Sequence, residues 1–318
     1  MPQHVLHAIF DLLSPIAVAQ LAPLSSVLDS AVASYWARDS HILASHFVSD
    51  VPRLFDLMDR TGTVFSGSAV VAALYHTYWR AHDLDVYCAA DSFQSIVDLF
   101  IDFEGYELAN PPRHLLPAGN EEYQRGSGIK TGYDDHPHIL QVAVLKKGGL
   151  KVDIIQSASA SSLEPVACFW TTLVQNFLSP NIICIAYPAL NDRGLSLLAP
   201  CQLVSMQLPS TETVGRIRKY EDRGYHFATR PTVFNKEGSC EGIASATCPA
   251  AVRFFGDKHC LTLRTQSLLV RNRADRGNDL LRQHNVLWWR GGYTCGAGCG
   301  TTGMKIWPGM LLKGDIDG

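Results

Sequence analysis

The amino-acid sequence predicts an α+β fold. Its 318 residues, 47% of them hydrophobic and 18% charged, are enough for about two domains with a sizeable core. Apolar positions recur at helical spacing near the start of the chain, and β-rich runs alternate with helix-like stretches from residue 61 onward. We therefore expect a helical segment at 1–60, a mixed sheet flanked by helices at 61–160, and an irregular Cys- and Gly-rich α/β extension at 161–318.

The composition disfavours several classes of function. The formal net charge of −3 provides no general basic field, so strong binding to duplex nucleic acid is not expected. No apolar run approaches the roughly 20 residues that cross a bilayer, and we expect no membrane partner. The apolar N-terminus lacks the basic start of a signal peptide and is interrupted by Asp11. Nine cysteines without a small-domain disulfide rhythm favour a reducing compartment, so the expected location is cytoplasmic or nuclear.

The first 47 residues predict a small bundle of short helices, because apolar residues such as Leu6, Ile9 and Phe10 recur at helical spacing. The stretch PQHVLHAIFDLLSPIAVAQLAPLSSVLDSAVASYW resembles the F-box, in which an apolar pair and Ile-Phe precede a Leu-rich turn. That resemblance implies that residues 1–47 bind the adaptor of a ubiquitin ligase. An equally open alternative is a helical cap that covers one face of the next domain.

Short runs of different periodicity predict the first half of the core. Thr63 to Ser66 is a β-branched and aromatic run, and Gly67-Ser68 separates it from a helix. Asp83 to Cys88 is then a strand, and Ser92 is placed to cap a second helix. The first helix is expected to bury Val70, Val71, Leu74, Tyr75 and Tyr78, and the second Phe93, Ile96, Val97 and Phe100.

A hairpin is the clearest local signal in the chain. In the segment HILQVAVLKKGGLKVDIIQ, two β-rich runs flank Gly148-Gly149, which is the composition of a tight turn. The second arm carries Asp153 between two apolar residues. Before the hairpin, residues 110–136 are rich in Pro, Gly, Asn and charge, and they predict a long exposed loop.

Three further elements are expected beyond the hairpin. Residues 166–178 predict a helix and residues 182–187 a strand. Residues 211–226, TETVGRIRKYEDRGYH, predict a charged and largely exposed helix that ends at Gly224.

The candidate site is acidic. On a strand, residues two apart point to the same face, so Asp83 and Asp85 share one side of theirs, and Asp153 repeats the arrangement on a strand that can lie only about 5 Å away. Like charges at short range raise one another's pKa, and a divalent cation removes the conflict by binding hard oxygen ligands. Mg²⁺ is the expected ion, with Mn²⁺ as the alternative. Gly67 lets a phosphate approach the backbone, and Ser68 with the helix-start amides can bind its oxygens.

This order of residues resembles the signature of the DNA polymerase β-like nucleotidyltransferase superfamily over residues 61–156. The resemblance implies that Asp83 and Asp85 ligate both metals, and that Asp153 ligates the catalytic metal and helps to activate the acceptor hydroxyl. It also implies that Gly67 and Ser68 hold the triphosphate. The implied activity is the metal-dependent transfer of a nucleotidyl group from a nucleoside triphosphate to a hydroxyl whose identity the sequence does not reveal.

A different class of function remains open at this point. In this alternative the nucleotidyltransferase fold is catalytically inactive and serves as a scaffold in an F-box-type substrate adaptor of a ubiquitin ligase. All three acidic positions are present, which keeps the enzymatic interpretation equally open.

A zinc site in the last third of the chain is a weaker hypothesis. Only Cys295 and Cys299 have the close spacing of a zinc ligand pair, so scattered thiols are the favoured interpretation. The candidate ligands are Cys240, Cys248, His259, Cys260, Cys295 and Cys299.

Three other groups of residues have both a functional and a structural interpretation, and the structural one is favoured for each. The lysines of the hairpin can contact phosphate or simply aid solubility. The Trp-Trp-Arg run can stack on a base or lie in the core. The groups are Lys146, Lys147 and Lys151; Trp288, Trp289 and Arg290; and Tyr220, Arg223 and Tyr225.

Overall fold

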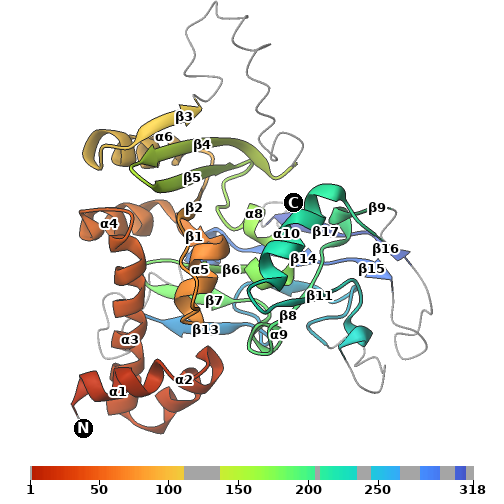
Figure 1. The fold of residues 1–318 in the computed structure, drawn as a ribbon, viewed down its shortest axis with the longest axis horizontal. Coiled ribbons are helices and arrows are strands. Elements are labelled where there is room, and N and C mark those ends of the chain that lie inside the picture. Colours follow the sequence, from red (N-terminus) through yellow and green to blue (C-terminus); the bar gives the residue numbers. More distant parts are fainter. Residues whose placement is uncertain are drawn as a thin grey trace, which may run out of the picture.

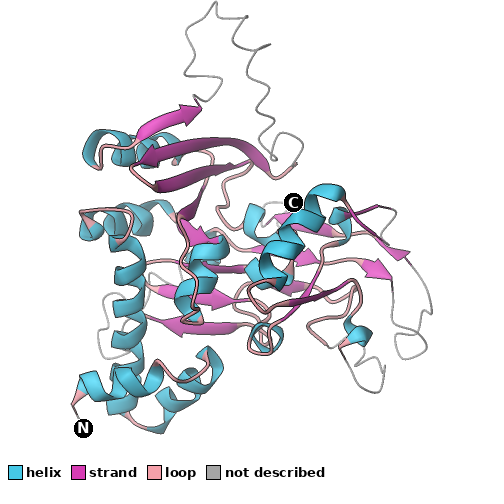
Figure 2. Ribbon diagram, in the orientation of Figure 1, coloured by secondary structure: helices cyan, strands magenta, loops and turns pink. Residues whose placement is uncertain are grey.

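The computed structural model of the chain shows a large mixed sheet with helices beside it, which confirms the α+β class (Figures 1 and 2). The structure describes residues 2–110, 137–204, 208–234, 245–265, 280–293 and 305–312. The exposed loop predicted at 110–136 lies almost entirely outside these residues. None of the helices in this part of the chain combines the length and the apolar character that spanning a bilayer requires.

Four α-helices precede the sheet. They are α1 (Gln3–Phe10), α2 (Pro15–Leu21), α3 (Ser26–Ser45) and α4 (Val51–Thr61), with a 3₁₀ turn, η1, at Ala22–Leu24. Polar side chains start three of these helices, because Ser14, Ser25 and Asp50 each accept a hydrogen bond from a backbone N–H of the first turn. The expectation of short helices is wrong for α3, which is 20 residues long.

The main sheet has the strand order β13-β7-β6-β1-β2-β5-β4-β3. The pair formed by β2 and β5 is parallel, and the other neighbouring pairs are antiparallel. The strands are β1 (Val64–Ser66), β2 (Asp83–Cys88), β3 (Glu107–Asn110), β4 (Ile139–Lys147), β5 (Leu150–Ser157), β6 (Asn176–Leu178), β7 (Ile182–Ile185) and β13 (Leu261–Arg264).

The predicted hairpin and the strand at 83–88 are confirmed. Strands β4 and β5 pair through Gly148-Gly149, and β2 begins at Asp83 and ends at Cys88. Helix α5 (Gly67–Leu74) follows β1 directly, and α6 (Phe93–Asp98) continues into a π-helical turn, η2 (Leu99–Phe103).

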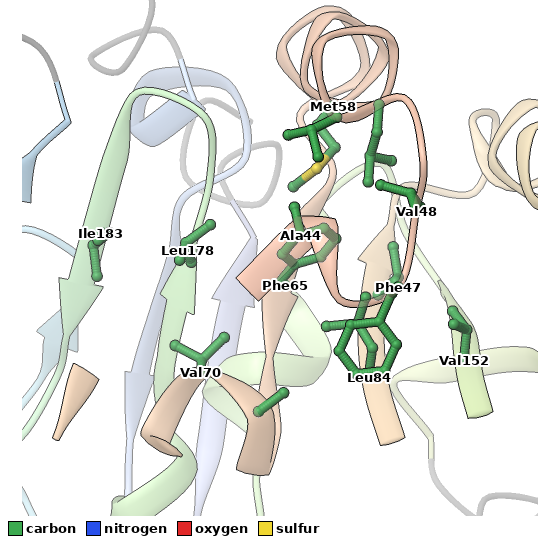
Figure 3. Packing of buried hydrophobic residues seen from close by; sticks show 14 of the residues in the cluster. Ala44, Phe47, Val48, Met58, Phe65, Val70, Leu84, Val152, Leu178 and Ile183 are labelled. Carbon is green, nitrogen blue, oxygen red and sulfur yellow. The ribbon is translucent and has the colours of Figure 1, made fainter. Parts of the chain in front are cut away.

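The N-terminal helices and the sheet share one hydrophobic cluster. Figure 3 shows Phe47 and Val48 of the α3–α4 connection, together with Met58 of α4, packed toward Phe65 and Leu84 of the sheet. All five side chains are nearly inaccessible to solvent. Burying such side chains contributes about 1.5–3 kcal/mol each, so the helices and the sheet stabilise one another. Figure 1 shows these helices along one side of the sheet.

The rest of the described chain consists of short elements around the strands β6, β7 and β13. They are α8 (Glu164–Ala167), η4 (Thr172–Val174), α9 (Pro188–Asn191), β8 (Leu195–Leu197), η5 (Pro200–Gln202), β9 (Leu203–Val204), β10 (Leu208–Pro209), α10 (Thr211–Glu221), β11 (His226–Ala228), η6 (Pro231–Val233), β12 (Arg253–Phe254), β14 (Val286–Trp289), β15 (Gly292–Tyr293), β16 (Lys305–Ile306) and β17 (Gly309–Leu312).

The predicted helix at 166–178 is wrong. In its place the chain forms the end of α8, the turn η4 and the strand β6. Most side chains of this segment are buried, and a run that is apolar on all sides does not distinguish a helix from a buried strand.

Two local expectations also differ from the structure. Helix α5 ends at Leu74, and His76 has a φ of 43°, so Tyr75 and Tyr78 are not on a helix and Tyr78 is 81% exposed. Ser92 occupies the cap position of α6, but its hydroxyl donates to Asp91 and makes no capping bond. The backbone of Ser92, with φ −98° and ψ −9°, is in the helical region and not in the extended region typical of a capping residue.

Candidate active site

The parallel pairing of β2 and β5 brings the three predicted aspartates into one cleft. Asp85 is the direct partner of Asp153, and Asp83 is the partner of Lys151. Paired residues of neighbouring strands point to the same face, and the strands lie about 4.8 Å apart. Asp83, Asp85 and Asp153 all line a cleft of about 330 Å³.

The turn from β1 into α5 places Gly67 and Ser68 in the same cleft. Ser66 pairs with Asp85 across the sheet, so the first residues of α5 lie beside that carboxylate. Gly67 has a φ of 73°, and a Cβ on it would lie 2.0 Å from the Asp85 Oδ2. A glycine is therefore required for two reasons, its left-handed backbone and its contact with Asp85.

The start of α5 has no side-chain cap. The hydroxyl of Ser66 at the cap position donates instead to the backbone carbonyl of Asn176. The amides of a helix's first turn have no partner within the helix, and they favour an anion. This helix start therefore opens on the cleft without an internal capping group.

The acidic side chains are poorly compensated. Burial, reinforced by the charges of Asp153 and Asp83, raises the pKa of Asp85 to about 8. Burial also raises the pKa of Asp153, against the opposing effect of Lys151. Asp83 is partly exposed. The cleft therefore favours a bound cation or a proton.

One cation of the chain already contacts this cluster. The Lys151 Nζ lies 2.6 Å from the Asp153 Oδ2. Burial acts to lower the pKa of Lys151, but the bond to Asp153 and the nearby Asp85 and Asp83 outweigh it and raise the pKa. The other oxygen of Asp153, Oδ1, is buried and has no hydrogen-bond partner. A buried carboxylate oxygen without a partner is costly, so this atom is open to a ligand.

The donor set fits a hard divalent cation in its chemistry. Carboxylate oxygens are the ligands that Mg²⁺ and Mn²⁺ prefer. Asp153 Oδ1 has no partner, and the raised pKa of Asp85 shows that its charge is poorly compensated. In the described residues, however, no group of three or more His, Cys, Asp or Glu side chains is already arranged to hold a metal ion. The bond to Lys151 occupies one oxygen of Asp153, and the other, Oδ1, has no partner, so the residues fit the ion in their donor chemistry.

Helix α10 forms part of the wall of the cleft. The charged, largely exposed helix expected at 211–226 is confirmed as α10 (Thr211–Glu221), although it ends before Gly224. It also lines the cleft with Arg216, Lys219 and the buried Tyr220. The positive charge of Lys219 acts on Asp85 and lowers its pKa, although burial dominates. The spacing i, i+3, i+4 of these three residues was the signal in the sequence, because it places them on one side of a helix.

Aromatic side chains complete the cleft. Tyr87 follows Asp83 and Asp85 on the same face of β2, and its ring meets that of Phe169 edge to face at 5.5 Å. Trp170 lies nearby, with its ring 5.8 Å from that of Tyr220. Phe169 and Trp170 come from the segment that was wrongly predicted as a helix, so their position could not be predicted.

Most of the other residues with a possible functional role lie outside the cleft or in the core. Lys146 and Lys147 are exposed, so Lys151 is the lysine of the hairpin that lines the cleft. Trp288 is 2% exposed and lies in a hydrophobic cluster. Tyr220 and Tyr225 are buried, and Arg223 lies over the ring of Trp79 at 3.8 Å. Cys240, Cys295 and Cys299 lie outside the described residues, so scattered thiols stay the favoured interpretation and the zinc site the weaker hypothesis.

Comparisons of the chain with known protein families, with curated proteins and with solved structures find no match.

Proposed function

We propose that this protein is a nucleotidyltransferase that transfers a nucleotidyl group from a nucleoside triphosphate to a hydroxyl acceptor. The observation that carries the proposal is the cleft in which the paired Asp85 and Asp153 meet the uncapped start of α5 at Gly67. An acidic pair suits a divalent cation, and the amides of a helix start suit a phosphate group.

The residues of the cleft have distinct roles in this proposal. Gly67 and Ser68 bind phosphate oxygens, and Lys151, Arg216 and Lys219 balance the charge of the triphosphate. Asp83, Asp85 and Asp153 would hold Mg²⁺ or Mn²⁺, which would neutralise phosphate charge and lower the pKa of the attacking hydroxyl.

The proposed reaction is an in-line displacement. The acceptor oxygen forms a bond to the α-phosphorus, the bond from that phosphorus to the bridging oxygen breaks, and pyrophosphate leaves. The proton of the hydroxyl passes to the Asp153 carboxylate, whose pKa is raised by burial.

Incorporation of labelled nucleotide into candidate acceptors, assayed with the full chain and Mg²⁺, tests this proposal. The double variant Asp83→Asn/Asp85→Asn is expected to lose turnover by roughly a hundredfold or more. The matched control is Asp98→Asn/Asp102→Asn, which makes the same chemical change at two exposed positions outside the cleft. Unchanged turnover in the first variant would show that the proposed site is not the catalytic one.

A second candidate function is a scaffold that binds a ubiquitin-ligase adaptor. The observation that favours it is exposed apolar surface on the N-terminal segment, where Leu12, Leu24 and Val27 are 85%, 68% and 67% exposed. Deleting residues 1–47 is a poor test, because Tyr35 and Trp36 of α3 belong to the shared core.

The triple variant Leu12→Ser/Leu24→Ser/Val27→Ser is a sharper test, since it leaves the core intact. The scaffold hypothesis predicts that the adaptor co-purifies with the natural chain and is lost from this variant. Absence of the adaptor from both preparations contradicts it.

A further inference from the structure

A second chamber adjoins the acidic cleft, and the proposed reaction leaves it without a role. Its volume is about 390 Å³, within the range of small-molecule sites. Cys168, Phe169 and Gln202 line both spaces, so the two are neighbours that share a wall. Phe169 forms part of this wall and also contacts Tyr87 on the acidic strand β2.

Aromatic and apolar side chains provide most of the chamber's surface. Phe169, Leu197, Trp288 and Trp289 line it. Trp289 is held in place, because its Nε1 donates to the Trp307 carbonyl at 2.7 Å and its ring lies where a side chain on Gly309 would otherwise be. A fixed indole provides a flat surface for a planar ring at little cost in conformational entropy.

A few oriented polar groups accompany these rings. The Nδ1 of His138 lies 2.7 Å from the Glu164 Oε1, and Glu164 is itself buried, so the imidazole has a defined orientation. The amide oxygen of Gln202 accepts a hydrogen bond from Thr213 of α10 at 2.9 Å, which holds its amide group between the chamber and the helix that carries Lys219. An apolar chamber with a small number of fixed polar groups is typical of a site for a planar, hydrogen-bonding ligand.

We propose that this chamber binds a nucleobase whose attached sugar and phosphate reach the acidic cleft past Phe169. The inference rests on the proposed function for the identity of the ligand. The base belongs either to the incoming nucleoside triphosphate or to the acceptor, and both present the same heterocyclic chemistry to Trp289, His138 and Gln202.

Binding of plain nucleosides to the full chain, in the absence of metal, tests the chamber separately from catalysis. Adenosine, guanosine, cytidine and uridine are the probes, and isothermal titration calorimetry is the measurement. At least one of them is expected to bind saturably. The variant Ala199→Phe places a ring inside the chamber, and the variant Gln202→Leu removes the amide group. Each variant is expected to weaken nucleoside binding roughly tenfold. Ala189→Phe, at an exposed position of α9, is the matched control.

The natural chain offers a readout that requires no variant. Cys201 lines the chamber and is exposed, so a bound nucleoside is expected to slow its alkylation by N-ethylmaleimide, measured by mass spectrometry of the peptide. Cys260 lies outside the chamber and is the internal control. The inference is overturned if no nucleoside binds saturably to the natural chain. It is also overturned if Ala199→Phe and Gln202→Leu bind nucleoside as tightly as the natural chain does.

Two further arms separate the sources of the base and the two proposals. A nonhydrolysable nucleoside triphosphate with Mg²⁺ displaces the nucleoside if the chamber takes the incoming base, and binds beside it if the chamber takes the acceptor. Asp83→Asn/Asp85→Asn is expected to keep nucleoside binding. Nucleoside binding without any nucleotidyl transfer overturns the proposed function alone, and transfer without nucleoside binding overturns the chamber alone.

Discussion

Gly67 and Asp85 are in such close contact that a single added carbon on Gly67 would lie 2.0 Å from the Asp85 Oδ2. The turn from β1 into α5 and the acidic strand β2 are therefore in direct contact.

The substitution Gly67→Ala is expected to impair both halves of the site. Alanine at a φ of 73° costs about 1–2 kcal/mol in backbone strain, and its methyl group would displace the Asp85 carboxylate. Gly105→Ala is the matched control, because Gly105 has a φ of 70° and open space where its Cβ would be. Thermal unfolding is expected to show a loss of stability in both variants, whereas the metal-dependent increase in Tm disappears only in Gly67→Ala. Equal metal responses would contradict the contact.

Asp85→Asn is expected to stabilise the metal-free protein at alkaline pH. Because the folded pKa of Asp85 is about 8 and the unfolded value is about 4, the contribution of Asp85 to stability is fully present below about pH 4. It is lost as pH rises through about 8, where the buried carboxyl must ionise. Because the loss accumulates between the unfolded and the folded pKa, thermal unfolding in EDTA from pH 4 to pH 9 is expected to give Tm values that are closest for variant and natural chain near pH 4. The values separate progressively as pH rises to about 8 and stay apart at pH 9, with the variant higher. A constant difference across the range would contradict this.

Lys151→Ala is expected to increase the response to divalent cations. The Lys151 Nζ lies 2.6 Å from Asp153, so its removal frees one carboxylate oxygen and leaves the cluster with less positive charge. The metal-free protein loses stability, by about 1 kcal/mol or less because this lysine is 40% exposed, and Mg²⁺ restores more of the Tm than in the natural chain. Lys146→Ala, on the partner strand of the same hairpin, is the control and should match the natural chain.

Lys219→Ala is expected to weaken nucleoside triphosphate binding about tenfold, because a charge-assisted contact to phosphate is lost. Arg218→Ala removes the same charge from the neighbouring residue, which is exposed and does not line the cleft. The increase in Tm with triphosphate and Mg²⁺ is the measurement. A similar loss in both variants would indicate a general charge effect rather than a specific contact.

Glu104→Gln is expected to remove part of the acid sensitivity of folding. The Oε2 of Glu104 accepts from the Ser49 backbone N–H at 2.7 Å, and its Oε1 accepts from that of Asp50 at 3.0 Å, which ties the start of α4 to the end of η2. Burial acts to raise the pKa of Glu104, but these donors outweigh it and lower the pKa. The stabilisation is therefore present above the unfolded pKa, near 4.3, and is lost as pH falls through the folded value. The variant is expected to lose about 1–3 kcal/mol at pH 7 by urea unfolding, and the difference narrows toward pH 3. A difference that does not change with pH would contradict the role of the carboxylate.

Local patterns in the sequence were sufficient to predict the two strands that carry Asp83, Asp85 and Asp153. The alternation in Asp83 to Cys88 predicts β2 with its correct bounds, and the two β-rich runs around Gly148-Gly149 predict the hairpin. Both depend on the two-residue period of a strand, which neighbouring residues alone determine. The glycine at the start of α5 was likewise visible, although its contact with Asp85 was not.

Tertiary packing decided the rest. Two features of the cleft join residues that are far apart in the chain. The parallel register of β2 and β5 places Asp85 beside Asp153, and α10 brings Lys219 and Tyr220 to the same cleft. The segment 166–178 was wrongly predicted because it is buried on nearly all sides, so it shows no period. The sequence by itself determined which strands are acidic on one face, since that is a local pattern. Only the folded structure decided which surfaces those faces meet, because long-range packing depends on the shapes of elements that local periodicity does not encode.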